Sequence, residues 1–327
     1  MRRILLTGGA GFIGSHVAEA LVRRANEVCI VDNFDTFYPS SWKRRNLDLV
    51  GKAGDFDFQE VDIRDLESLS RVFEGHRPDI VIHLAAKAGV RPSIHDPATY
   101  YEVNVRGTLN LLEMCRQQRV GKFLFGSSSS VYGDANSAPW SEDVTNLRPV
   151  SPYAASKVAG ELLCHTYAHL HAITVVCLRF FTVYGPRQRP DLAIHKFTSL
   201  IEAGLPIPIY GDGTAGRDFT HVSDIVRGIL AAIDFASRNG VSFEIFNLGN
   251  SHPVALNELV AALRKATQKA VEIRHEPPQP GDVSLTWANI SKAAQLLGYR
   301  PRTTLEDGLA NFVAWYRSEP RVERRAA

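Results

Sequence analysis

The feature that most constrains the fold is a glycine motif directly after the first apolar segment. Residues 4–6 are Ile-Leu-Leu, and Gly8, Gly11 and Gly14 follow them. Glycines at this spacing let the backbone turn from a strand into a helix and approach a pyrophosphate at the helix N-terminus. A glycine triplet can also be a plain strand–helix connection. Asp32, however, ends the second apolar segment, where a carboxylate is expected to bind a ribose diol and repel a 2′-phosphate. The motif therefore predicts a site for NAD rather than NADP.

Short apolar segments alternate with longer helical patterns through the first half of the chain. This alternation predicts an α/β fold with a Rossmann-type, doubly wound parallel sheet. The expected strands cover residues 4–6, 27–31, 57–61, 80–84, 122–125, 172–179 and 244–248. Residues 1–182 are expected to form the NAD-binding domain, to which the chain returns at about 222–249. Proline- and glycine-rich loops are frequent in residues 183–327, which predicts a smaller, interleaved C-terminal substrate-binding lobe.

Charge and cysteine usage exclude several classes of protein. The 327 residues include 37 basic and 35 acidic ones, a net charge of +2, which argues against a nucleic-acid or membrane surface. Cys29, Cys115, Cys164 and Cys177 have neither the spacing of a metal site nor that of a redox pair. We expect buried free thiols in a reducing, cytoplasmic environment. His83 lies within an apolar strand and is expected to be a core residue, and no metal site is predicted.

Further residues are expected to contact the cofactor from the ends of neighbouring strands. Asp62 and Ile63 follow the third strand, and the small segment Leu84 to Lys87 follows the fourth. For these two groups a role as loop filler is nearly as consistent with the sequence. The complete expected cofactor-binding set is Gly8, Gly11, Phe12, Ile13, Gly14, Asp32, Asn33, Asp62, Ile63, Leu84, Ala85, Ala86, Lys87, Tyr153 and Lys157.

Tyr153 and Lys157 form the expected catalytic pair. Their four-residue spacing places both side chains on one face of a helix, where an ammonium can lower the pKa of a phenol. Such a phenol can accept a proton from an alcohol that is being oxidised. Ser128 lies in a serine run after the fifth strand, where doubly wound sheets bind ligands. We expect its hydroxyl to bond the reacting sugar oxygen, although an exposed pair and a flexible turn are the simpler alternatives.

Together these motifs resemble the extended short-chain dehydrogenase/reductase superfamily, and the resemblance covers nearly the whole chain. It rests on the glycine motif, Asp32, residues 84–86, 127–133, 153–157 and 217–219. In that superfamily a serine, a tyrosine and a lysine assist hydride transfer on a nucleotide sugar. The resemblance assigns these roles to Ser128, Tyr153 and Lys157, and NAD as the cofactor. It also implies a homodimer.

The residues beside the serine run resemble epimerases more than other branches of the superfamily. The 4,6-dehydratases carry an Asp-Glu pair where this chain has Ser129 and Ser130, and the glutamate typical of UDP-glucuronate decarboxylases is absent. The segments 88–93 and 178–191 look like those of UDP-glucuronate 4-epimerases. UDP-galactose 4-epimerases usually have asparagine in place of Thr182.

The expected substrate residues include an arginine that could bind the carboxylate of an acidic sugar. Arg189 can pair bidentately with a carboxylate, and Thr182 can donate a further hydrogen bond. In the alternative, Arg187 and Arg189 bind only the pyrophosphate or solvent. The resemblance assigns the diphosphate and ribose to Arg217 and Asp282. The complete expected set is Ser128, Ser129, Thr182, Arg189, Arg217 and Asp282.

The resemblance implies an isomerase that converts UDP-glucuronate to UDP-galacturonate. The implied path is transient oxidation to a 4-keto sugar, rotation about the diphosphate and return of hydride to the opposite face. The alternatives are a 4-epimerase for UDP-glucose or UDP-N-acetylglucosamine, a UDP-glucuronate decarboxylase, and a non-catalytic NAD-binding protein.

Overall fold

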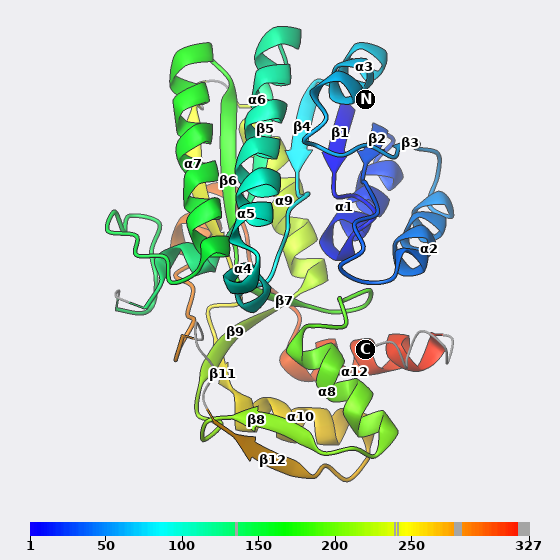
Figure 1. The fold of residues 1–327 in the computed structure, drawn as a ribbon, viewed down its shortest axis with the longest axis vertical. Coiled ribbons are helices and arrows are strands. Elements are labelled where there is room, and N and C mark those ends of the chain that lie inside the picture. Colours follow the sequence, from blue (N-terminus) through cyan, green and yellow to red (C-terminus); the bar gives the residue numbers. More distant parts are fainter. Residues whose placement is uncertain (135–136, 239, 241, 278–282, 320–327) are drawn as a thin grey trace.

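The computed structural model describes residues 1–134, 137–238, 240, 242–277 and 283–319. Its largest element is a seven-stranded, wholly parallel sheet, which confirms the predicted Rossmann-type fold (Figure 1). In spatial order its strands are β10 (Phe243–Leu248), β6 (Thr174–Phe180), β5 (Lys122–Ser128), β4 (Ile80–His83), β1 (Arg3–Thr7), β2 (Glu27–Val31) and β3 (Asp57–Gln59). The chain order reverses between β1 and β4, and a doubly wound sheet binds its ligand at such a switch point.

Successive apolar side chains along these strands point to opposite faces of the sheet. They contribute to two hydrophobic cores, one on each face. Leu5 and Val81 point into one core, whereas Ile4 and Ile82 point into the other. The first core is covered by α3 (Leu66–His76), α6 (Gly107–Gln118) and α7 (Pro152–His171). The second is covered by α1 (Phe12–Arg23), α2 (Ser40–Gly51), α9 (Val222–Ala236) and α11 (Ser291–Leu297).

The smaller lobe lies below the main sheet in Figure 1, at the carboxyl ends of the strands. One of its sheets contains β7 (Thr182–Tyr184), β9 (Gly216–His221) and β11 (Pro253–Ala255), and the other β8 (Ile207–Tyr210) and β12 (Ile273–Glu276). They pack with α8 (Ala193–Ala203), α10 (Leu256–Thr267) and α12 (Leu305–Ser318) around a third core. Four short segments lie between elements of the main domain. α4 (Val90–His95), α5 (Pro97–Tyr101) and the π-helix η1 (Glu102–Arg106) lead from β4 to α6, and the 3₁₀ helix η2 (Ser129–Tyr132) follows β5.

Six of the seven expected strands differ from the observed ones at one or both ends, by one to three residues, and the strand over residues 27–31 agrees. The segment expected to extend to Val61 stops at Gln59. The segment expected to start at Ala172 starts at Thr174, because Ala172 adopts a left-handed conformation (φ +53°) that ends α7. β10 pairs with β6 throughout, so the chain re-enters the main sheet after building part of the smaller lobe.

The expected core residues lie where the sequence predicts them. All four cysteines are free and buried. His83 is buried, with Nδ1 at 2.8 Å from Thr7 Oγ1 and Nε2 at 3.0 Å from Thr108 Oγ1, and burial lowers its pKa to about 3. The described residues contain no group of histidines, cysteines and carboxylates able to hold a metal ion. No helix in the described ranges is long and apolar enough to cross a membrane.

Candidate active site

A cleft opens at the switch point between β1 and β4, and the glycine motif forms its floor. Gly8 has φ +72°, and a Cβ there would lie 2.7 Å from the backbone nitrogen of Ala85. A Cβ on Gly14 would overlap the carbonyl oxygen of Gly8. Only glycine fits both positions, so α1 can begin directly under the cleft with Gly11 as a cap that has no side chain. The first-turn amides of α1 have no intrahelical acceptor and suit an anion.

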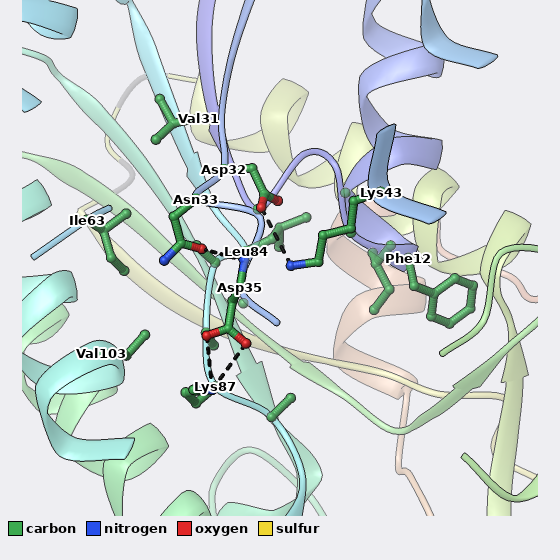
Figure 2. Close-up of a pocket in the computed structure, with 18 of the residues that line it drawn as sticks. Phe12, Val31, Asp32, Asn33, Asp35, Lys43, Ile63, Leu84, Lys87 and Val103 are labelled. Carbon is green, nitrogen blue, oxygen red and sulfur yellow. Dashed lines mark hydrogen bonds and ion pairs between the residues drawn. The ribbon is translucent and has the colours of Figure 1, made fainter. Parts of the chain in front are cut away.

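Asp32 lies at the end of β2 and is buried beside the cleft. Its Oδ1 accepts a hydrogen bond from the backbone N–H of Phe34 (2.9 Å), and its Oδ2 accepts one from Ala10 (3.2 Å). Lys43 Nζ lies 3.7 Å from Oδ1 (Figure 2). Burial raises the pKa of Asp32, while Lys43 and the two amides oppose the rise. The carboxylate is thus held in place by groups on three segments.

Every residue of the expected cofactor set lines this one cleft. Asp62 accepts hydrogen bonds from Arg64 and from Asn33 Nδ2 (2.9 Å), and chiefly the Arg64 contacts lower its pKa to about 2. In the same cleft, Lys87 Nζ lies 3.0 Å from Asp35 Oδ2. Dashed lines mark this pair in Figure 2. Residues 62–63 and 84–87 both line the cleft, where they could contact a cofactor.

Helix α7 presents the tyrosine and lysine from its first turns. Ser151 caps the helix by accepting a hydrogen bond from the N–H of Ala154 (3.2 Å), and Pro152 occupies a first-turn position that suits its fixed φ. Tyr153 and Lys157 follow on one face, and both line the cofactor cleft. The ammonium of Lys157 is buried and donates to the carbonyl oxygen of Gly126 at 2.7 Å.

The expected effect of Lys157 on the pKa of Tyr153 needs correction. Burial raises the pKa of Tyr153 above its ordinary value, and the opposing effects come from a hydrogen bond with Ser128 and from the charge of Arg189. Lys157 is directed to Gly126 instead, and burial lowers its own pKa to about 8. Ser128 and Arg189, rather than Lys157, are thus the groups that oppose the rise in the pKa of Tyr153.

A second cleft adjoins the first and shares Tyr153 and Arg189 with it. The expected substrate residues that line it are Ser128, Ser129, Thr182, Arg189 and Arg217. No aspartate or glutamate is among its described lining residues, and both of its charged residues are arginines. Asp282 lies outside the described residues. The cleft therefore suits an anionic ligand and holds no described carboxyl group for eliminating water.

The two arginines of the loop after β7 have different partners. Arg187 Nη2 lies 2.6 Å from Glu19 Oε2 on α1, and its loop is further held by a 2.9 Å contact between His16 Nε2 and the carbonyl oxygen of Pro186. Arg189 lines both clefts and pairs with Asp191. Arg187 therefore anchors the loop to the cofactor domain, and Arg189 faces the ligand.

Sequence reasoning missed Lys43, which lines the cofactor cleft, and two residues that support the site, Tyr100 and Asn104. Lys43 pairs with Asp32 across the cofactor cleft, and Tyr100 places its ring edge-on to Tyr153 at 6.2 Å between centroids. Asn104, in the π-helix, accepts from the N–H of Lys87 (2.8 Å) and donates to Ser156 Oγ (2.9 Å). It thereby ties the loop after β4 to α7. No local spacing rule marks a π-helix, so the sequence offered no signal for Asn104.

The glycine cradle, Asp32 and the Tyr153–Lys157–Ser128 group define a short-chain dehydrogenase/reductase built for a nucleotide sugar. The family described as GDP-mannose 4,6 dehydratase matches residues 5–312. The chain belongs to this family of NAD-dependent nucleotide-sugar enzymes, and the expected superfamily membership is confirmed.

Individual relatives are similar along nearly the whole chain. A UDP-glucuronate 4-epimerase of Arabidopsis thaliana is 43% identical, over 99% of this chain and 77% of the relative. The crystal structure of a Bacillus cereus UDP-glucuronic acid 4-epimerase, in complex with UDP-glucuronic acid and NAD, is 39% identical, with a TM-score of 0.89, covering 95% of this chain and 98% of that one. A Thermotoga maritima UDP-glucose 4-epimerase with UDP-glucose is 34% identical, with a TM-score of 0.88, covering 96% and 98%.

Proposed function

We propose that this protein is an NAD-dependent isomerase that interconverts UDP-glucuronate and UDP-galacturonate by inverting C4. One observation carries the proposal. Tyr153, shared by both clefts, faces a substrate cleft whose charged described residues are arginines and which includes Ser128, Ser129 and Thr182. With NAD as hydride acceptor and donor, this set could move the proton of a hydroxyl group that is oxidised and re-formed, and it could bind an anion, but it contains no described acid for dehydration. The likeness to UDP-glucuronate 4-epimerases of Arabidopsis and Bacillus cereus supports the same function.

The cofactor cleft fits NAD on the chain's own geometry. The glycine motif (Gly8, Gly11 and Gly14) lets a pyrophosphate approach the backbone closely. The buried Asp32 carboxylate can accept hydrogen bonds from a ribose diol. NAD, when bound, supplies the acceptor and donor of the hydride at C4. The chain's part is to hold the sugar beside it and to move the hydroxyl proton.

The proton is moved by Tyr153. Its phenolate accepts the C4 hydroxyl proton as C4 is oxidised, and the phenol returns that proton when C4 is reduced. Ser128 hydrogen-bonds the same oxygen, and the charge of Arg189 favours the phenolate. Lys157 lines the same cleft, where its ammonium is fixed by the carbonyl oxygen of Gly126.

The sugar carboxylate needs to be held because its 4-keto form is a β-keto acid that can lose CO₂. Arg189 and Thr182 line the cleft together with the serines of the run after β5. A bidentate contact with Arg189 and a hydrogen bond from Thr182 would fix the carboxylate plane. Decarboxylation requires the breaking C–C bond to align with the ketone π system. A carboxylate that is held so that this bond lies out of alignment would therefore not be lost as CO₂.

A 4-epimerase for UDP-glucose, whose sugar is uncharged, is the second candidate, favoured by the likeness to the Thermotoga maritima enzyme. The test is to incubate the NAD-loaded protein separately with UDP-glucuronate, UDP-glucose and UDP-N-acetylglucosamine and to resolve the products by NMR. We expect the C4 epimer of UDP-glucuronate at the highest kcat/KM. A UDP-pentose with CO₂ release would identify a decarboxylase, preferred turnover of UDP-glucose the second candidate, and no turnover a non-catalytic protein.

We further propose that the protein acts as a cytoplasmic homodimer. Leu162 and Leu170 on α7 are 64% and 63% exposed, so they are available for contact with the same helix of a second copy. The four buried free thiols suit a reducing compartment. Light scattering coupled to size-exclusion chromatography tests the dimer, and cell fractionation tests the location.

A further inference from the structure

The Arg189–Asp191 ion pair stands where the two clefts meet. Arg189 lines both clefts, and its Nε and Nη2 donate to Oδ1 and Oδ2 of Asp191 at 2.9 Å each. The side chains of Arg189 and Asp191 are 18% and 34% exposed. The pair is therefore a parallel, two-bond fork on the rim of the site rather than a loose surface contact.

The pairing uses one edge of the guanidinium. Arginine carries five N–H donors, and Asp191 engages the edge formed by Nε and Nη2. Among the described residues, only Asp191 forms hydrogen bonds with the Arg189 side chain. The edge formed by Nη1 and Nη2 thus remains for a second carboxylate. The flat face is held as well, because the guanidinium carbon lies 5.3 Å from the centroid of the Phe37 ring.

The backbone keeps Asp191 in this place. Pro190 separates the two residues and fixes its own φ, and the N–H of Leu192 donates to the carbonyl oxygen of Arg189 at 3.3 Å, which closes a turn. The loop is anchored upstream by Arg187 on Glu19. Asp191 is thus built into the same short loop as the arginine that it orients.

We infer that Asp191 is a specificity-determining residue. It orients the Arg189 guanidinium so that the edge formed by Nη1 and Nη2 binds the carboxylate of an acidic nucleotide sugar. The inference rests on the proposed function. Because Asp191 also compensates the charge of Arg189, selection depends on bidentate geometry more than on charge alone. Asp191 touches no substrate in this account and acts through Arg189, as a positioning residue.

A double-mutant cycle on the NAD-loaded full chain tests this role. Binding of UDP-glucuronate and UDP-glucose is measured by calorimetry, with kcat and KM for each, in wild type, Asp191→Ala, Arg189→Ala and the double variant. We expect Asp191→Ala to weaken UDP-glucuronate binding about tenfold and UDP-glucose binding by less than about threefold. In the Arg189→Ala background, removal of Asp191 should change the affinity for neither UDP-glucuronate nor UDP-glucose. Asp191→Asn keeps one acceptor and should recover part of the loss.

Asp234→Ala is the matched control, since it removes an exposed aspartate that pairs with Arg2 and lines neither cleft. Equal losses on both sugars, additive losses in the double variant, or tighter UDP-glucuronate binding by Asp191→Ala would each overturn the inference. The last result would mean that Asp191 competes with substrate for Arg189. If wild type epimerises UDP-glucuronate but Asp191→Ala equals it, only this inference fails; if wild type does not, the proposed function fails.

Discussion

Lys157 shows at the scale of one residue how burial changes the chemistry of a charged group. Its ammonium sits in a nearly closed environment, 4.9 Å from the Phe125 ring centroid, with the Gly126 carbonyl oxygen as its hydrogen-bond acceptor. Burial disfavours the charged form and lowers the pKa to about 8. A charge kept at such a cost to stability is expected to serve function, and Lys157 lines the cofactor cleft together with Tyr153.

This cost predicts a pH-dependent stability difference between wild type and Lys157→Met. The folded pKa is about 8 and the unfolded value is 10.5, so the unfolded chain binds more protons between these values. Wild type should therefore gain about 3 kcal/mol relative to the variant as pH rises from about 8 to above 10. Urea unfolding of both proteins across this range measures the difference. A difference that stays constant with pH would contradict the assigned pKa.

Helix α7 shows at the scale of an element how the catalytic group is held. Glu161 lies on the buried side of α7 and pairs with Arg179 on β6 at 2.7 Å, with side chains only 5% and 2% exposed. Glu161 Oε1 also accepts a hydrogen bond from Ser127 at 2.6 Å, and Ser127 lines both clefts. One carboxylate thus ties α7 to two strands beside the site.

We expect Glu161→Gln to destabilise the protein by about 3–5 kcal/mol, because it leaves the buried charge of Arg179 uncompensated. Chemical denaturation measures the loss. The double variant Glu161→Gln/Arg179→Met removes both charges and should recover much of it. Glu67→Gln is the control, since its partner Arg71 is 65% exposed and the pair should contribute less than about 1 kcal/mol. A loss no larger than that of the control would refute the structural role of the pair.

At the scale of the whole molecule, the residues that were predictable are those whose chemistry is local in the sequence. Gly8 and Gly14 are fixed by backbone geometry, and Tyr153 and Lys157 by helical spacing. Asn104 was not predictable, because its role depends on a π-helix and on contacts with distant segments.

The pairing of Arg189 with Asp191 was also not predictable from the sequence. Its chemistry as a carboxylate fork was predictable, but its partner Asp191 depends on how the loop after β7 turns. The pKa of Tyr153 was mispredicted for a related reason: the direction of the Lys157 ammonium toward Gly126 is set by packing between α7 and β5.

The two-lobed arrangement has one consequence for the reaction. The cofactor cleft is built at the end of the parallel sheet, and the lining of the adjoining substrate cleft includes residues of β7 and β9. Both strands belong to the smaller lobe below the main sheet in Figure 1. Tyr153 lies at their junction. A sugar held by its diphosphate in the second cleft can therefore present either face of C4 to the same tyrosine and the same nicotinamide.

The most direct test of this account uses UDP-glucuronate carrying deuterium at C4, incubated with the NAD-loaded protein in ordinary water. If one hydride leaves C4 and returns to its opposite face, UDP-galacturonate should form with its C4 deuterium retained, and Tyr153→Phe should reduce the rate by at least about a hundredfold while NAD stays bound. NMR and mass spectrometry read both the epimer and the label. Product that has exchanged its C4 label for solvent hydrogen, or near-normal turnover by Tyr153→Phe, would contradict the account.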